Sequence, residues 1–130
     1  GTGRSVGEEL LSVHGSYLPV FKRLFDTGVI RGLAHVTGGG IPGNLPRVLP
    51  DGLGATVDRG SWRVPSVFQT LQDAGNVDRY EMDRVFNMGI GMIAIVSEHD
   101  VDAVAASAAE RGIGSRVIGR IVPGEGVAYQ

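Results

Sequence analysis

Apolar residues recur with helical spacing in three parts of the chain. In each part they occupy positions i, i+3, i+4 and i+7, which places them on one face of a helix. The three sets are Tyr17, Val20, Phe21 and Leu24; Val64, Val67, Phe68 and Leu71; and Val101, Val104, Ala105 and Ala108. Start and stop signals are found at Ser16 and Gly28, at Pro65 and Gly75, and at Gly112. A short fourth helix is predicted over residues 79–86, because Asp78 and Glu81 have the spacing of a capping box.

Strand-like runs alternate with these helices. They cover Gly32–Thr37, Gly54–Asp58, Gly89–Val96 and Arg116–Val122, with a fifth short piece at Gly126–Tyr129. Residues 92–96 are apolar at every position, which is typical of a strand covered on both faces. The alternation of helix and strand predicts an α/β layer domain.

The size of the chain suits a single domain. A mass of 13.7 kDa predicts an accessible surface of roughly 6,600 Å² for the folded chain. A chain of this size buries enough of its unfolded surface to form a core without cross-links. Residues 1–9 are polar and Gly-rich, and we expect a loose lead-in there and the domain itself over residues 10–130. Residue 1 is Gly and not Met, which indicates a processed product or a piece of a longer chain.

Composition excludes several kinds of site. The absence of cysteine excludes disulfides, Cys-based zinc sites and thiol catalysis. A net charge of −2 offers no electrostatic footprint for nucleic acid. The longest apolar run is far too short to cross a bilayer and no signal peptide precedes it, so we expect no membrane partner and a cytoplasmic location. His14 and His99 lack the spacing of metal ligands and are interpreted as structural, so no metal site is expected.

The strongest local signal is a glycine-rich segment over residues 35–47, in a chain with 21 glycines. Gly38, Gly39 and Gly40 directly follow a predicted strand. Asn44 is placed to cap a short helix, with Pro46 in its first turn. A strand, a glycine turn and a helix start can bind an anion through successive backbone amides. The alternative is that the glycines only form a tight turn; the spacing matches neither the P-loop nor the dinucleotide fingerprint.

Two residues of this segment, His35 and Arg47, each have two interpretations. His35 and Thr37 lie on one side of the same strand, so His35 either contacts a phosphate or moves a proton, or is a core histidine bonded to a carbonyl. Arg47 either reaches the anion or is a solvated charge. Asn87 and Gly89 are typical of a helix C-cap. Trp62 is expected to pack at a corner.

Several motifs, taken in order, resemble the C-terminal domain of the aminoimidazole ribonucleotide synthetase family, also called phosphoribosylformylglycinamidine cyclo-ligases. They are residues 35–40, 44–50, 58–62, 71–77, 81–82 and 86–92, and the closing strand at 117–119. Formylglycinamidine ribonucleotide synthase, selenophosphate synthetase, thiamine-phosphate kinase and the hydrogenase maturation dehydratase share this domain type. Residues 44–50 and 86–89 favour the cyclo-ligase. The chain departs from the family at Gly43, where relatives carry an acidic residue.

The resemblance implies a fold, a reaction and a site. The fold is an α/β sandwich with a four-stranded, mainly mixed sheet and packed helices. The complete enzyme converts formylglycinamidine ribonucleotide to aminoimidazole ribonucleotide in purine biosynthesis, with ATP and magnesium bound mainly by an N-terminal domain that this chain lacks. Phosphate or substrate binding is expected at Thr37, Gly38, Gly39, Gly40, Asn44 and Asn87, with His35 as the catalytic candidate.

The resemblance also implies partners. They are the N-terminal ATP-binding domain and a phosphorylated small molecule, while the chain alone is expected to bind no cofactor and to be inactive. An apolar face left bare without that domain predicts self-association. Two alternatives remain, which are a stand-alone module that binds a phosphorylated metabolite and a truncated remnant.

Overall fold

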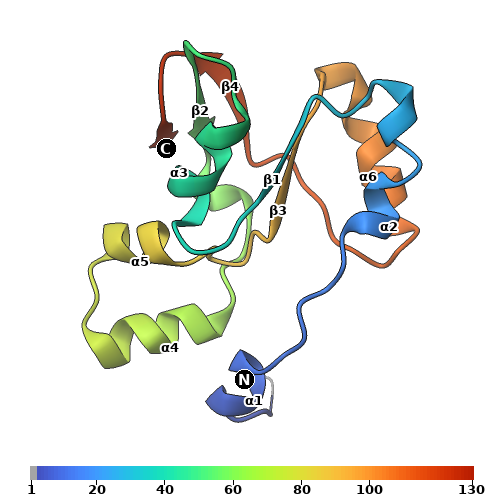
Figure 1. The fold of residues 1–130 in the computed structure, drawn as a ribbon. Coiled ribbons are helices and arrows are strands. Elements are labelled where there is room, and N and C mark those ends of the chain that lie inside the picture. The colour runs from blue at the N-terminus through green and yellow to red at the C-terminus, as the bar shows by residue number, and fades with distance from the viewer. Residues whose placement is uncertain (1–2) are drawn as a thin grey trace.

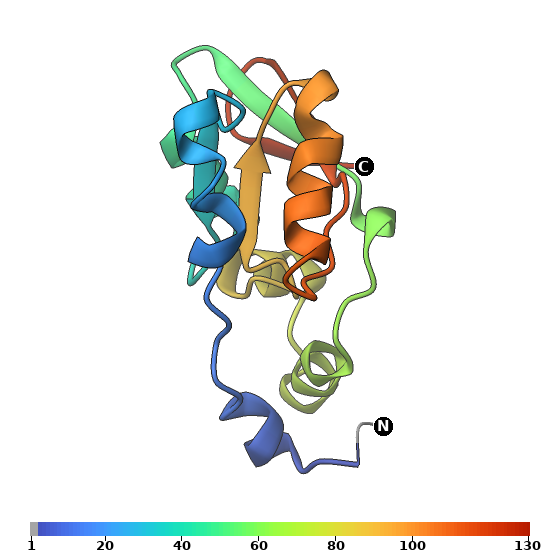
Figure 2. The ribbon, with the colours of Figure 1, turned by 90° about the vertical axis from the view of Figure 1, so that its right-hand side faces the viewer.

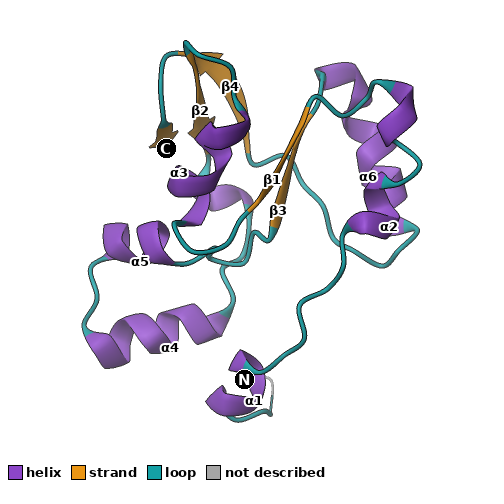
Figure 3. Cartoon of the chain, viewed as in Figure 1, coloured by secondary structure: helices purple, strands orange, loops and turns teal. Residues whose placement is uncertain are grey.

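The computed structural model describes residues 3–130. Its helices are α1 (Val6–Leu10), α2 (Leu18–Phe21), α3 (Gly40–Asn44), α4 (Ser66–Gly75), α5 (Arg79–Val85) and α6 (Val101–Ala109). Its strands are β1 (Gly32–His35), β2 (Leu53–Val57), β3 (Met92–Ile95), β4 (Gly119–Pro123) and β5 (Val127–Tyr129). Short 3₁₀ turns cover Phe25–Thr27, Leu45–Val48, Arg59–Ser61 and Glu98–Asp100. The predicted α/β class is confirmed (Figures 1 and 3).

The strands form two sheets and not the single four-stranded sheet that was expected. β1 pairs with β3 in antiparallel register from Gly32 opposite Ile95 to His35 opposite Met92. In the second sheet β2 is central, antiparallel to β4 and parallel to β5. β4 and β5 occupy both edges of β2, and β1 and β3 pair with each other instead of extending that sheet.

The β1–β3 pair is covered on both faces, as the apolar run at 92–96 predicted. On one face Ala34, Val36 and Ile93 join a core with residues of β2 and with Trp62. On the other face Leu33, Met92 and Ala94 pack against α2 and α6 through a cluster of Val20, Phe21 and Ala108. Figure 2 shows α2 and α6 side by side over this face. The pair is therefore the central layer of the domain.

The helix predictions hold in part. The first helix is only one turn long, Tyr17 and not Ser16 is its N-cap, and Gly28 ends the following 3₁₀ turn at φ 75°. The second helix begins after Pro65 and ends at Gly75, as predicted. The first helix has a proline in its first turn, as helix starts often do, but its N-cap makes no side-chain hydrogen bond.

Asp78 caps α5 as predicted, with its Oδ1 accepting from the Tyr80 amide at 2.8 Å. The predicted capping box is incomplete, because the Glu81 carboxylate pairs with Arg84.

Helix α1 covers residues 6–9 of the predicted lead-in together with Leu10, and it stands away from the body and contacts α4 (Figure 1). No helix within residues 3–130 is long and apolar enough to cross a membrane.

Candidate functional site

The glycine segment forms a tight turn between β1 and α3. Gly39 and Gly40 adopt positive φ angles of 97° and 58°, which favour glycine. The Gly40 amide donates to the Thr37 carbonyl at 3.0 Å. Within residues 3–130, the amides of Thr37, Gly38 and Gly39 have no hydrogen-bond acceptor, and Thr37 and Gly38 are exposed. The turn therefore presents successive free donors to solvent, which is the arrangement that an anion needs.

Asn44 holds this turn together from inside. Its side chain is buried, and Nδ2 lies 2.8 Å from the Gly40 carbonyl, 3.2 Å from that of Gly38 and 3.4 Å from that of Thr37. Asn44 is the N-cap residue of the 3₁₀ segment Leu45–Val48, as predicted, but its side chain makes no cap hydrogen bond there. The unpredicted helix α3 already begins at Gly40. The left-handed conformations at Gly39 and Gly40 allow the chain to enter the helix at once. Pro46 does lie in the first turn of the next 3₁₀ segment, as predicted.

The turn rests directly on α5. A Cβ on Gly40 would overlap the Asp83 carbonyl oxygen and lie 2.9 Å from that of Phe86. An open depression of about 550 Å³ adjoins this contact. It is lined by Gly38, Gly39, Pro42, Gly43, Arg84 and Val85. The glycine turn and the end of α5, more than forty residues apart in the sequence, thus meet at one surface.

Arg84 supplies the positive charge of that depression. Its Nε and one terminal nitrogen each donate to Glu81 at 2.8 Å. These bonds lower the pKa of Glu81 and raise that of Arg84, so both groups stay charged at neutral pH. Sequence reasoning missed Arg84 because only the fold shows that the last turn of α5 borders the glycines.

His35 has a partner that the sequence did not predict. Its Nε2 lies 3.2 Å from Nε2 of His14, and the His14 ring packs edge-on against Tyr17 at a centroid distance of 5.3 Å. His35 is exposed at the end of β1, so it is not the core histidine bonded to a carbonyl that was one interpretation. An exposed imidazole next to the free amides is able to contact a ligand or move a proton.

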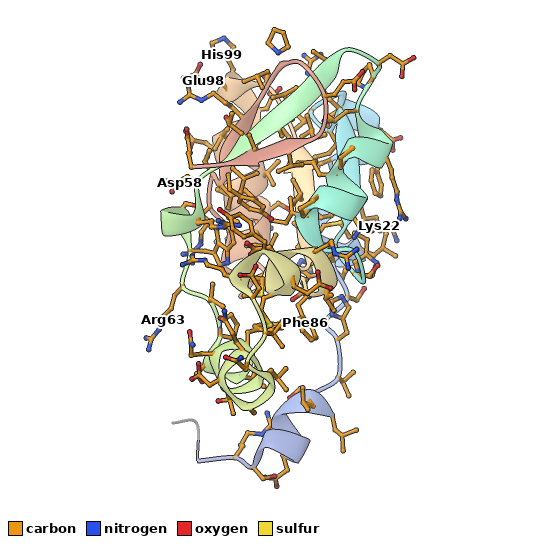
Figure 4. All side chains as sticks on the ribbon, turned by 90° about the vertical axis from the view of Figure 1, so that its left-hand side faces the viewer. Lys22, Asp58, Arg63, Phe86, Glu98 and His99 are labelled. Atoms are coloured by element: carbon orange, nitrogen blue, oxygen red, sulfur yellow. The ribbon has the colours of Figure 1, made fainter. Side chains whose placement is uncertain are left out.

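Asn87 stabilises its own turn. Its Oδ1 accepts from the Gly89 amide at 3.0 Å, and Met88 and Gly89 both have positive φ. Trp62 is buried, as expected of a packing residue, and its Nε1 donates to the Met88 carbonyl at 3.0 Å. Phe86, which begins this turn, is labelled in Figure 4. Arg47 is exposed.

A buried ion pair connects α5 to the second sheet. Arg59 pairs with Asp83, and its guanidinium lies 3.9 Å from the ring centroid of Tyr129. Burial and the Asp83 charge raise the pKa of Tyr129 to about 12, against a smaller lowering by Arg59. Asp83 therefore fixes α5, the helix on which the glycine turn rests.

Within the described residues no cluster of three or more His, Cys, Asp or Glu side chains is arranged to hold a metal.

Comparison with known proteins agrees with the motifs. The family model for the C-terminal domain of AIR synthase related proteins matches residues 17–130. A phosphoribosylformylglycinamidine cyclo-ligase of Geobacillus sp. is 44% identical over 124 residues, which are 95% of this chain and 36% of that protein. The enzyme of the same name from Bacillus velezensis is 43% identical over 126 residues, which are 97% of this chain and 36% of that protein. The chain thus spans 36% of the length of the curated relatives it matches.

Solved structures show the same fold. The hydrogenase maturation protein HypE of E. coli superposes with a TM-score of 0.67 at 20% identity, over 95% of this chain and 39% of that one. A thiamine-monophosphate kinase from Stenotrophomonas maltophilia gives a TM-score of 0.59 at 18% identity, over 82% and 33%. Since the family model covers nearly the whole described chain, the chain belongs to the family of AIR synthase related proteins, matching their C-terminal domain.

Proposed function

We propose that this chain is the C-terminal part of an ATP-dependent cyclo-ligase that closes the imidazole ring of formylglycinamidine ribonucleotide. The observation that carries the proposal is the identity of 41–44% to enzymes of that name across 95–97% of the chain. Because the match spans 36% of those enzymes, the reaction requires the rest of such an enzyme. In this proposal an N-terminal domain binds ATP and magnesium in the cytoplasm, and the chain alone is inactive.

In the proposed site, the amides of Thr37, Gly38 and Gly39 bind a phosphate group, with Arg84 as the neighbouring cation. The free donors and the adjoining depression support this assignment. Gly40, Asn44 and Asn87 act by shaping the two turns, as their internal contacts suggest. His35 is the candidate proton-transfer or substrate-contacting group, since it is exposed two residues before the amides.

A chimera tests this function. The corresponding 36% of the Geobacillus enzyme is replaced by this chain, and ATP-dependent formation of aminoimidazole ribonucleotide is measured. We expect turnover by the chimera and none by the 130-residue chain alone. Arg84→Gln in the chimera should raise the KM for substrate by about 10- to 150-fold, because a charge-assisted hydrogen bond contributes about 1.5–3 kcal/mol. Arg79→Gln, at the other end of α5, is the matched control.

Sustained turnover by the isolated chain would contradict the need for a second domain. A folded chimera that binds ATP but forms no product would contradict the assigned reaction.

The free amides also favour a second candidate, a stand-alone module that binds phosphorylated metabolites. An NMR amide titration of the isolated chain with ribose 5-phosphate separates the two. Shifts confined to residues 37–39 and His35 would establish a preformed phosphate site in this chain. No shift at millimolar ligand would exclude the module and leave the cyclo-ligase proposal intact.

A further inference from the structure

The imidazole rings of His14 and His35 lie side by side at the surface. His14 lies in the exposed segment that leads into α2, and His35 is the last residue of β1. Their Nε2 atoms lie 3.2 Å apart, and the rings are tilted by 39° at a centroid distance of 5.2 Å. Both side chains are exposed, so solvent and small ions reach the two nitrogens.

The separation matches that of two ligands on one metal ion. Zinc–imidazole bonds of about 2.0–2.1 Å place two tetrahedral ligands about 3.3–3.4 Å apart. With the same bond length, two adjacent octahedral ligands lie about 2.9 Å apart. The observed 3.2 Å lies between these values, so both nitrogens can bind a common ion once each ring turns its lone pair away from the line that joins them.

We propose that His14 and His35 form a two-histidine site for a divalent transition-metal ion such as zinc, nickel or copper. Imidazole nitrogen favours these ions over magnesium and calcium, which prefer oxygen ligands. Because no third His, Cys, Asp or Glu joins the pair within residues 3–130, water completes the coordination.

The surroundings hold one ligand in place. The His14 ring packs on Tyr17, whose hydroxyl lies against Gly91. A Cβ on Gly91 would overlap that hydroxyl and lie 3.3 Å from His14 Cε1, so the glycine makes room for both rings. The second ligand is fixed by the β1–β3 pairing, in which His35 lies opposite Met92. Both imidazoles are therefore positioned before an ion binds.

The metal would have two effects. It would join the N-terminal segment to the end of β1, and it would occupy Nε2 of His35, two residues before the free amides. Zinc is therefore expected to inhibit the cyclo-ligase chimera, and this effect rests on the proposed function. Binding itself does not rest on it, so failure of either claim can be recognised separately.

Calorimetric titration of the 130-residue chain with zinc chloride tests the site. We expect one ion per chain, and no binding of magnesium chloride. His14→Gln and His35→Gln should each weaken zinc binding by more than about tenfold, since even the loss of an outer-shell partner costs 10–100-fold. His99→Gln is the matched control, because the third histidine of the chain lies in a 3₁₀ turn at the end of the molecule opposite α1 (Figure 4).

A further variant tests whether weaker binding in His14→Gln comes from the lost ligand or from unfolding. His14→Cys should retain zinc binding, because a thiolate replaces the imidazole as ligand. Unchanged affinity in both His14→Gln and His35→Gln would overturn the proposal, as would loss of binding in His99→Gln.

Discussion

At the scale of single residues, Gly40 decides whether the glycine turn can rest on α5. Its φ of 58° and the overlap of any Cβ with the Asp83 carbonyl leave no room for a side chain. Gly40→Ala should therefore lower the free energy of unfolding by about 2–4 kcal/mol, measured by urea denaturation.

Gly43→Ala is the matched control within the same short helix. A Cβ on Gly43 meets nothing within 4 Å, and its backbone is helical. Alanine should stabilise the protein there by about 0.5–1 kcal/mol. Equal effects at the two positions would show that α3 does not contact α5 as described.

Two asparagines in the site use different atoms of their side-chain amides. Asn44 donates through Nδ2 to carbonyls, whereas Asn87 accepts through Oδ1 from the Gly89 amide. Asn44→Asp removes a buried donor and places a carboxylate among carbonyls, so the free energy of unfolding should fall by about 2–3 kcal/mol. Asn87→Asp retains its acceptor and should change it by less than about 0.5 kcal/mol. Thermal or urea unfolding of both variants decides this, and a reversed order would contradict it.

At the scale of elements, the Arg59–Asp83 pair determines how α5 is held against the second sheet. Both side chains are largely buried, and the Nε of Arg59 lacks a hydrogen-bond partner among the described residues. Asp83→Ala leaves a buried guanidinium unpaired and should destabilise by about 3–5 kcal/mol. The double variant Arg59→Met/Asp83→Leu removes both charges and should lose less. If the single and double variants lose the same free energy in urea unfolding, the unpaired guanidinium is not the cause of the loss, which would contradict the prediction.

Tyr129, in strand β5, makes the free energy of unfolding depend on pH in the alkaline range. Its pKa is about 12 in the folded chain against 10.0 ordinarily, chiefly because of burial. The folded state thus keeps a proton that the unfolded state loses, so stability is complete below pH 10 and falls between pH 10 and 12. Urea midpoints measured from pH 9 upward should show this decline, and Tyr129→Phe should reduce it. Tyr80→Phe, at a side chain 75% exposed, is the control and should leave the decline unchanged.

At the scale of the whole molecule, the chain exposes more surface than its size requires. Its accessible surface is 8389 Å², against roughly 6,600 Å² for a compact monomer of this mass. Part of the excess is apolar and lies on the N-terminal segment, where Leu11 is 84% and Val13 96% exposed. These residues are candidates for contact with another domain or another copy.

Self-association therefore remains a prediction for the chain alone. Light scattering at increasing concentration should give a mass above 13.7 kDa. Leu11→Glu combined with Val13→Glu should lower that mass, whereas Val117→Glu, on an exposed residue outside the segment, should not. A strictly monomeric parent chain at high concentration would contradict the prediction.

Much of the fold could be predicted because its signals are local. The α4 boundaries at Pro65 and Gly75 and the cap at Asp78 depend on neighbouring residues only. The division into two sheets could not be predicted, because it depends on which strand takes each edge of β2. The same holds for the side chain of Asn44, which donates to carbonyls of the glycine turn and makes no cap bond in the 3₁₀ segment that follows it.

The sequence by itself determined the α/β class, the covered strand at 92–96, the glycine turn and, through motif order, the family. These follow from periodicity and backbone freedom, which act between near neighbours. Only the tertiary structure decided that Arg84 borders the glycines, that Asp83 meets Arg59 and that His14 lies 3.2 Å from His35. Such pairs join residues 21 or more positions apart, and their contact depends on how the layers pack, which no local pattern encodes.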